Sequence, residues 1–391
     1  MKFTMSAEDE GFRQEVRSFL GQELGANWQG ANQRESVSPE QWDFSRRFTR
    51  KLAGKGWLTL AWPTEYGGMG ASHMRQLVYN EEMSYAGAPQ AVGSGISLAG
   101  PTIMVHGNEV QRREFLPAIA SGESVWCQLF SEPGSGSDLA SLQTRAVEDG
   151  DDFVINGQKI WTSGAHQSDW AILLARTEPD APKHRGISYF LMDMKSPGVE
   201  VRPLINMLGG HAFNEVFMEN VRVPRRNMVG EQNRGWYVAT TTLDFERSGI
   251  GRFASGKRQL EELVDLARGR NGHGAAHRTR LKAELADRAI ELEAGRLLAY
   301  RVGWLQSQGR VPNYEASIVK VFGSEMMQRL AQTGIKLLGL SGQIAPGSAQ
   351  APLDGRPEAG YLAAVAQTIA AGTSEIQRNI IATRGLGLPR A

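Results

Sequence analysis

Two short stretches of the chain gather side chains that could act on a flat, polar ligand. Residues 127–140 read CQLFSEPGSGSDLA, and residues 157–170 read GQKIWTSGAHQSDW. A planar redox-active ring needs hydrogen bonds along its polar edge, a cover for one face and an open second face. Hydroxyl side chains, small glycines and a large indole can supply these contacts. The two stretches are therefore the first candidates for a functional site.

The glycine run in the first stretch is weak evidence by itself. At Gly134-Ser135-Gly136, backbone N–H groups can approach an anion or a carbonyl closely, because glycine has no side chain. The segment lacks the lysine of a phosphate-binding P-loop, and no βαβ pattern surrounds it. An ordinary hairpin turn would have the same composition, and Trp161 alone would suit the core of a β domain. The prediction of a functional site therefore depends on the occurrence of both stretches together.

The elements that would position these stretches fall into three zones. Apolar residues recur at helical spacing in residues 1–123, which predicts an N-terminal helical domain. Residues 124–235 contain short segments rich in β-branched and aromatic residues without intervening helices, which predicts a central antiparallel β-barrel domain. Helical spacing returns in residues 236–391, with the long apolar stripes of a four-helix bundle. The predicted fold is thus a multidomain α+β protein.

One turn within the central zone has a specific signal. Asn156-Gly157 stands between the strand-like segments DFVI and QKIW. Both residues tolerate the positive φ angles of a tight two-residue turn. We therefore predict a β-hairpin turn at this dipeptide.

Composition excludes several classes of protein. The 43 basic and 42 acidic side chains nearly cancel, so no global field attracts nucleic acid. The lone cysteine, Cys127, excludes an intramolecular disulfide and a CxxC metal or redox motif, and fits a small buried strand residue. The polar N-terminus MKFTMSAEDE is unlike a secretory signal, and no apolar run is long enough to span a bilayer. We expect a cytoplasmic protein without a membrane span or a metal site.

Taken together, SEPGSGSD followed by GQKIWTSG resembles the flavin site of the acyl-CoA dehydrogenase family. The segments LPAIASGE, EVFMENVRVPRRNMVGEQNRGW and GTSEIQRNIIATRGLGLPR extend the resemblance over nearly the whole chain. The resemblance implies a helix–β–helix architecture, FAD as cofactor and an acyl-CoA substrate. It also implies electron-transfer flavoprotein as electron acceptor and a tetramer with FAD across a subunit interface.

The resemblance also assigns roles to single residues. Ser131 would hydrogen-bond the pyrimidine edge of the flavin, Trp161 would stack near the ring, and Ser163 would bond near N5. Ser137 would contact the CoA moiety. The cofactor-binding residues that the resemblance implies are Gln128, Phe130, Ser131, Gly136, Ser137, Trp161, Thr162, Ser163, Thr373 and Glu375.

The reaction of this family needs a carboxylate that removes the weakly acidic α-proton of the thioester. Many members carry it immediately before the C-terminal Gly-Thr, where this chain has Ala371, which cannot accept a proton. A minority, including isovaleryl- and long-chain-type enzymes, place it at the start of the C-terminal bundle. Glu246 in TTLDFERSGIGR matches that position, so we predict Glu246 as catalytic base with Asp244 and Arg247 near the substrate. The alternative for Glu246 and Arg247 is an ion pair on a helix surface.

Two segments depart from the family pattern. ARGRNGHGAAHRTRLKAEL lacks the Arg-x-x-Phe-Gly element that helps to hold the FAD of a neighbouring subunit; Arg278 or Arg280 could reach a phosphate, but a solvated loop is the simpler interpretation. In KLLGLSGQ, Lys336 and Leu340 replace a glutamine and a glycine of the family motif. This combination resembles a bacterial branch that handles steroid side-chain CoA thioesters, in which some members are α2β2 complexes that build each FAD site from two chains.

The leading hypothesis is α,β-dehydrogenation of a bulky or branched acyl-CoA, such as a steroid side-chain thioester. A second hypothesis is a non-catalytic partner chain of a heteromeric dehydrogenase, which Ala371 favours and Glu246 opposes. A third is a flavin oxidase or monooxygenase on the same fold, since a fold does not fix a reaction.

Overall fold

The computed structural model describes most of the chain, and contacts between residues divide it into two compact units. The described residues are 5–25, 28, 30, 38–89, 91–242, 248–269 and 275–389. The bundle unit comprises Met1–Arg34, Ser72–Ala88 and Arg247–Ala391, and the sheet unit comprises Glu35–Ala71 and Pro89–Glu246. Each unit is described below by itself.

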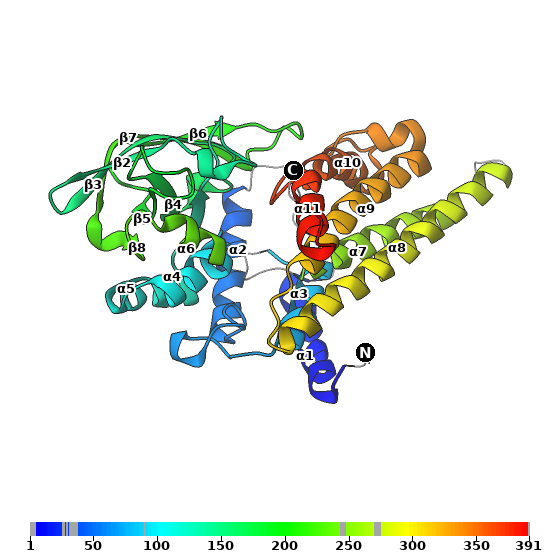
Figure 1. Cartoon of the computed structure of the whole chain (residues 1–391). Helices are drawn as coiled ribbons and strands as arrows, with labels where there is room; N and C mark the ends of the chain where they lie inside the picture. Colours follow the sequence, from blue (N-terminus) through cyan, green and yellow to red (C-terminus); the bar gives the residue numbers. More distant parts are fainter. Residues whose placement is uncertain are drawn as a thin grey trace. The chain divides into compact units, whose positions relative to one another are not determined.

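The sheet unit is built on an eight-stranded sheet (Figure 1). Its strands follow the order β6-β7-β3-β2-β4-β5-β8, and β1 pairs with β4. The strands are β1 (Trp126–Leu129), β2 (Arg145–Asp149), β3 (Asp152–Lys159), β4 (Trp170–Arg176), β5 (Ile187–Asp193), β6 (Val199–Leu204), β7 (Phe213–Pro224) and β8 (Met228–Val229).

The sheet is mixed rather than antiparallel. β1 runs parallel to β4, β2 also meets β4 in parallel, and the other pairs are antiparallel. The β2–β3 hairpin intervenes in the chain between β1 and β4, so the chain can return beside β1 in the same direction. The strand order ends at β6 and β8 without closing. The predicted β domain is confirmed, but the closed antiparallel barrel is not.

The predicted hairpin turn at Asn156-Gly157 is wrong. Both residues lie inside β3, where the pairing with β7 shifts register between Ile155 and Gly157. A Cβ atom on Gly157 would lie 2.5 Å from Oγ1 of Thr144, so glycine allows a close approach of two segments here. The turn between β2 and β3 falls instead at Gly150, whose φ is +63°.

The described part of the sheet unit also contains helices. They are α2 (Pro39–Gly54), α4 (Gly100–His106), α5 (Glu109–Ala120) and α6 (Gly235–Thr242). α4 packs against α5 and α6, and α6 packs against β5. Trp126 on β1 stacks on Trp170 of β4 at 5.8 Å between ring centroids, with Phe115 of α5 edge-on to both. Cys127, the next residue of β1, belongs to a second apolar cluster, so it is a buried strand residue as predicted.

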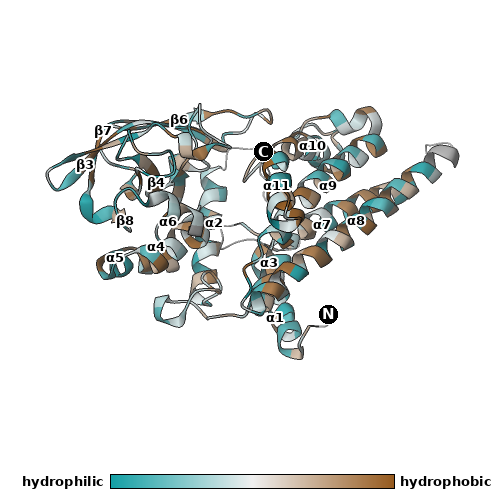
Figure 2. Ribbon diagram, in the orientation of Figure 1, coloured by the Kyte–Doolittle hydropathy of each residue, from teal (hydrophilic) through white to brown (hydrophobic). Residues whose placement is uncertain are grey.

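The bundle unit consists of long helices around one apolar core. Its helices are α1 (Ala7–Leu24), α3 (His73–Ala86), α7 (Ile250–Gly269), α8 (Ala275–Ser307), α9 (Tyr314–Leu338), α10 (Arg356–Gln367) and α11 (Ser374–Ile380). α7, α8 and α9 pack on one another, α10 and α11 pack on α9, and α3 packs on α1, α7 and α8. Brown apolar residues recur along α7, α8 and α9 between teal polar ones (Figure 2), which is the pattern of core-forming helices. No helix among the described residues is long and apolar enough to cross a membrane.

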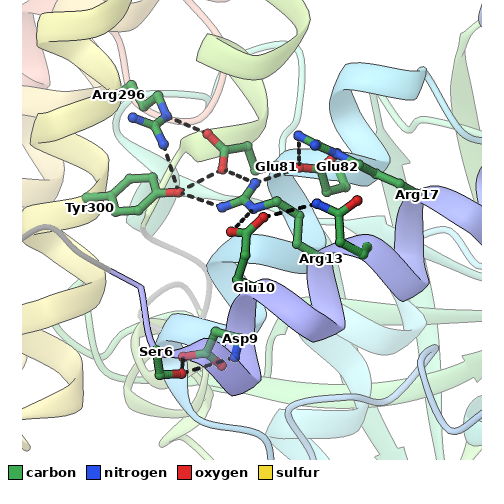
Figure 3. A network of polar contacts seen from close by, with 10 residues as sticks. Ser6, Asp9, Glu10, Arg13, Arg17, Glu81, Glu82, Arg296 and Tyr300 are labelled. Atoms are coloured by element: carbon green, nitrogen blue, oxygen red, sulfur yellow. Dashed lines mark hydrogen bonds and ion pairs between the residues drawn. The ribbon is translucent and has the colours of Figure 1, made fainter.

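A buried ionic network joins α1, α3 and α8 (Figure 3). The Arg13 guanidinium on α1 donates to Glu81 at 2.8 Å and to Glu82 at 2.5 Å, both on α3. Arg296 and the Tyr300 hydroxyl on α8 donate to Glu81 at 2.6 and 2.7 Å. Arg13, Glu81, Glu82 and Arg296, but not Tyr300, line a cavity of about 1420 Å³ whose walls come mainly from α1, α3, α7 and α8. The N-terminal helices α1 and α3 thus belong to the same packed unit as the C-terminal ones.

Candidate functional site

The structure places the two stretches singled out in the sequence side by side. The backbone N–H of Ile160, just after β3, donates to the carbonyl of Ser131 at 2.9 Å. The ammonium of Lys159 donates to the carbonyl of Phe130 at 3.0 Å and to Oε1 of Glu132 at 2.8 Å. Three hydrogen bonds therefore fix the serine-rich turn against the segment that leads into Trp161.

The ion pair between Lys159 and Glu132 is the most deeply buried charged pair of this site. Lys159 is fully buried, and Glu132 also accepts from the backbone N–H groups of Gln143 at 2.6 Å and Thr144 at 2.9 Å. Burial lowers the pKa of Lys159 to about 8, with the Glu132 charge opposing that shift. Burial alone would raise the pKa of Glu132, but the Lys159 charge and the hydrogen bonds hold that pKa below its ordinary value. The pair is therefore ionised at neutral pH, with two acceptors around the Lys159 ammonium and three donors around the Glu132 carboxylate.

Three serine hydroxyls of the two stretches are free to bind a ligand. Among the described residues, none hydrogen-bonds the side chain of Ser131, Ser137 or Ser163, and the last two are exposed. A Cβ atom on Gly136 would meet nothing within 4 Å, so the turn is open on that side. Ser135, by contrast, is buried, and its hydroxyl lies 3.0 and 3.1 Å from two backbone carbonyls of the same turn. The turn is thus held from within and offers its outer hydroxyls to a partner.

Trp161 combines an unusual backbone with an exposed side chain. Its φ is +61°, in the left-handed region that a bulky L-residue enters only at a cost in free energy. Its side chain is 58% exposed and touches Phe213 edge-on at 6.1 Å between centroids. The alternative of a core aromatic is therefore wrong. A strained residue that presents a flat apolar ring to solvent suits stacking on a planar ligand.

Thr162 and Phe130 are buried, so a cofactor could contact only a few atoms of each residue. Thr162 is 1% exposed, and its hydroxyl has no hydrogen-bond partner among the described residues. An unsatisfied buried hydroxyl costs about 1–3 kcal/mol, so a ligand atom that reached it would be favoured. The Phe130 ring packs edge-on against Tyr189 in the core, so only a backbone atom of Phe130 could contact a ligand. Gln128 is half-buried on β1.

The predicted C-terminal residues lie in the bundle unit. Ala371 has a φ of +53° and Gly372 a φ of +83°, so the segment before α11 also has a left-handed backbone at a non-glycine residue. The Thr373 hydroxyl accepts from the backbone N–H of Ile376 at 3.2 Å and caps α11. Glu375 is exposed, and hydrogen bonds from its own backbone N–H and from Thr373 lower its pKa. Ala371 itself offers only a methyl group, which cannot accept a proton.

Asp244, Glu246 and Arg247 lie outside the described residues, as does the side chain of Arg278. Arg280 and Lys336 both pair with Glu284 on the bundle surface, at 3.3 and 3.2 Å, and Leu340 is 84% exposed.

Comparison with known proteins decides the family. Residues 6–123 match the N-terminal domain of acyl-CoA dehydrogenase, residues 127–221 the middle domain and residues 233–386 the C-terminal domain. The chain belongs to the acyl-CoA dehydrogenase family. The acyl-CoA dehydrogenase IpdE1 of Mycobacterium tuberculosis is 38% identical over 389 residues, which cover 97% of this chain and 98% of that protein. The predicted oxidoreductase family is confirmed.

Solved structures similar to this acyl-CoA dehydrogenase include two complexes. One is named Tcur3481-Tcur3483 steroid ACAD, with a TM-score of 0.90, 36% identity and full coverage of both chains. Another is the ChsE4-ChsE5 complex from Mycobacterium tuberculosis, with a TM-score of 0.88, 34% identity and full coverage of both chains. Both are similar to this chain over all three domains.

Several polar residues of this site were missed by the sequence interpretation. Lys159, Glu132 and His166 lie inside the two stretches. Two opposite charges next to apolar strand segments are a pattern from which Lys159 and Glu132 could have been predicted. His211 and Asn214 come from a distant segment that folds against Thr162. The sequence contains no local signal for them.

Proposed function

We propose that this chain catalyses FAD-dependent α,β-dehydrogenation of an acyl-CoA thioester. Membership of the acyl-CoA dehydrogenase family supports the reaction class. The proposal that FAD is the cofactor depends on one observation. Trp161 is strained and exposed, and its neighbourhood in the two stretches contains the free hydroxyls of Ser131 and Ser163. These groups match a flat ring with a hydrogen-bonding edge. When bound, FAD supplies the acceptor for the β-hydrogen, which leaves the substrate as a hydride.

The chain's own residues would hold the cofactor and the substrate. Ser131 would bind the pyrimidine edge, Ser163 and Thr162 the region of N5, and Trp161 the ring face. Ser137, on the open side of the turn, would contact the CoA moiety. Gln128, Phe130, Gly136, Thr373 and Glu375 complete the proposed cofactor set.

Glu246 is the proposed base. A carboxylate takes an α-proton efficiently when burial raises its pKa toward the working pH and brings it within hydrogen-bond reach of the carbon. Ala371 leaves the usual position in the family without a carboxylate. Glu246 matches the alternative position in the sequence, with Asp244 and Arg247 proposed beside the substrate.

The proposed substrate carries a bulky or branched acyl group, such as a steroid side chain. The similarity to a structure named as a steroid ACAD supports this class. Relatives named acyl-CoA dehydrogenases do not favour a non-catalytic chain, an oxidase or a monooxygenase. Electron-transfer flavoprotein is the proposed acceptor.

We propose that the chain works as a tetramer, either of one chain or of α2β2 composition. On α8, Ile290, Leu297 and Trp304 recur at heptad spacing and are exposed, which is the pattern of a helix face that packs on another chain. On α10, Tyr361 and Val365 are exposed as well. The similarity to two structures named as pairs of chains supports the heteromeric form.

One set of measurements tests the proposed function. The purified chain is titrated with FAD, and turnover is then measured on straight-chain, branched and steroid CoA thioesters with an artificial electron acceptor. We expect bound FAD and formation of the α,β-unsaturated thioester, with the highest kcat/KM on a bulky acyl group. A preparation that binds FAD but oxidises none of the thioesters would contradict the activity. One FAD per chain in the chain alone would contradict the α2β2 form.

A further inference from the structure

Trp161 holds a conformation that its own residue type disfavours. A non-glycine residue with φ of +61° persists only where its surroundings over-determine it. Among the described residues, the indole has one ring contact, edge-on with Phe213, and it is otherwise largely exposed. Packing of the side chain therefore cannot be the main restraint, and the restraint must act on the backbone beside it.

That restraint is Asn214, the second residue of β7. Its backbone N–H donates to the Thr162 carbonyl at 3.0 Å, and its carbonyl accepts from the Thr162 N–H at 3.0 Å. Its side-chain Nδ2 donates to the same Thr162 carbonyl at 3.0 Å. The Gly164 N–H donates to the Ala212 carbonyl at 3.2 Å, so the loop is held over its whole length. Asn214 is fully buried, which excludes water from these bonds.

Two stacked histidines fix the orientation of the Asn214 amide. The rings of His166 and His211 lie 4.1 Å apart at 24°, with the amide bridging them. Nε2 of His211 lies 2.7 Å from Oδ1 of Asn214, and Nδ2 of Asn214 lies 3.2 Å from Nδ1 of His166.

One set of tautomers satisfies all of these contacts. Nδ2 of Asn214 donates to the Thr162 carbonyl, so the other end of the amide, Oδ1, is an acceptor. His211 must therefore donate to Oδ1 from its Nε2. His166 must accept at its Nδ1 from Nδ2 of Asn214. Partial burial and the neighbouring His211 ring lower the pKa of His166, which favours the neutral ring that an acceptor at Nδ1 requires. Both histidines therefore prevent the amide from flipping.

We infer that Asn214, held by His166 and His211, is a positioning residue for the flavin: it keeps the strained Trp161–Ser163 loop in the conformation that presents the indole and the Ser163 hydroxyl to the cofactor. The inference rests on the proposed function, because it assigns the loop to FAD. It adds residues from β7 and its preceding loop to the site. None of them is proposed to touch the substrate.

Asn214→Asp tests the inference with the smallest change in shape. The aspartate can still accept from His211, but it cannot donate to the Thr162 carbonyl or to His166. We expect FAD affinity of the apoprotein, measured by flavin fluorescence, to fall by about tenfold or more, since two buried hydrogen bonds are lost. We also expect a shifted flavin absorption spectrum in the loaded protein. Asn220→Asp, an exposed asparagine on the same strand, is the matched control and should change neither.

His166 gives a second test that does not depend on the buried position, because its side chain is exposed and its replacement should leave folding intact. We expect His166→Leu to weaken FAD binding and shift the flavin spectrum, and His166→Gln, which keeps an acceptor, to restore both. Wild-type FAD affinity and an unshifted spectrum in Asn214→Asp and His166→Leu would overturn the inference, even if the melting temperature fell. Failure of the wild type to bind FAD, both as the single chain and in its tetramer, would instead overturn the proposed function.

Discussion

At the residue scale, the site depends on the buried ion pair between Lys159 and Glu132. Lys159 is fully buried and Glu132 nearly so, and burying an ion pair often contributes little net stability. The pair does fix position, however. Lys159 holds the Phe130 carbonyl, and Glu132 binds two backbone N–H groups beyond the turn. Its role is to fix the geometry of Ser131 against Ile160.

Lys159→Met should strongly destabilise the sheet unit. The change leaves the Glu132 carboxylate buried without its cation, so we expect the free energy of unfolding to fall by about 3–5 kcal/mol in urea denaturation. The double variant Lys159→Met/Glu132→Gln should lose less free energy of unfolding than Lys159→Met alone, because no buried charge remains in it. Lys183→Met removes an exposed lysine paired with Asp138 and should leave the free energy of unfolding nearly unchanged. Equal losses for the two lysines would contradict this account of the buried pair.

At the scale of elements, the network in Figure 3 connects helices that are far apart in sequence. Arg13 lies on α1, Glu81 and Glu82 on α3, and Arg296 on α8. All four contribute partly or fully buried side chains. The network therefore sets how the N-terminal helices pack within the bundle unit.

Arg13→Ala should destabilise the bundle unit. It leaves Glu81 and Glu82 with fewer cationic partners in a buried place, although Arg17 and Arg296 remain, so we expect a loss of about 3 kcal/mol. Arg268→Ala breaks an exposed pair with Asp265 and is the control, with little expected change. Thermal unfolding followed by circular dichroism compares the two variants. A shift in the melting temperature no larger for Arg13→Ala than for the control would show that the network does not hold α1 in place.

The errors of the sequence interpretation also belong to the scale of elements. Asn156-Gly157 has the composition of a hairpin turn, but its glycine is needed for contact with Thr144, a residue that only the folded sheet brings near. The closed antiparallel barrel was not confirmed, because the sheet ends at β6 and β8 and because the parallel pairing of β1 with β4 joins segments that are far apart in the sequence. Local patterns contain no information on either contact.

At the scale of the whole molecule, helix–β–helix zoning could be predicted, because periodicity reports which faces are buried. The serines and Trp161 of the candidate site could be found from their motif. Asn214 and His211 could not, because they reach the site only through tertiary folding. The proposed base, Glu246, rests on the sequence alone.

The most direct measurement is anaerobic reduction of the flavin by an acyl-CoA substrate. The wild type and Glu246→Gln are loaded with FAD to the same extent, mixed with a thioester that the wild type turns over, and followed by flavin absorbance. We expect rapid bleaching in the wild type and a rate at least about a hundredfold lower in Glu246→Gln, since general base catalysis contributes about 10²–10⁴-fold. Bleaching of Glu246→Gln at the wild-type rate would contradict the account.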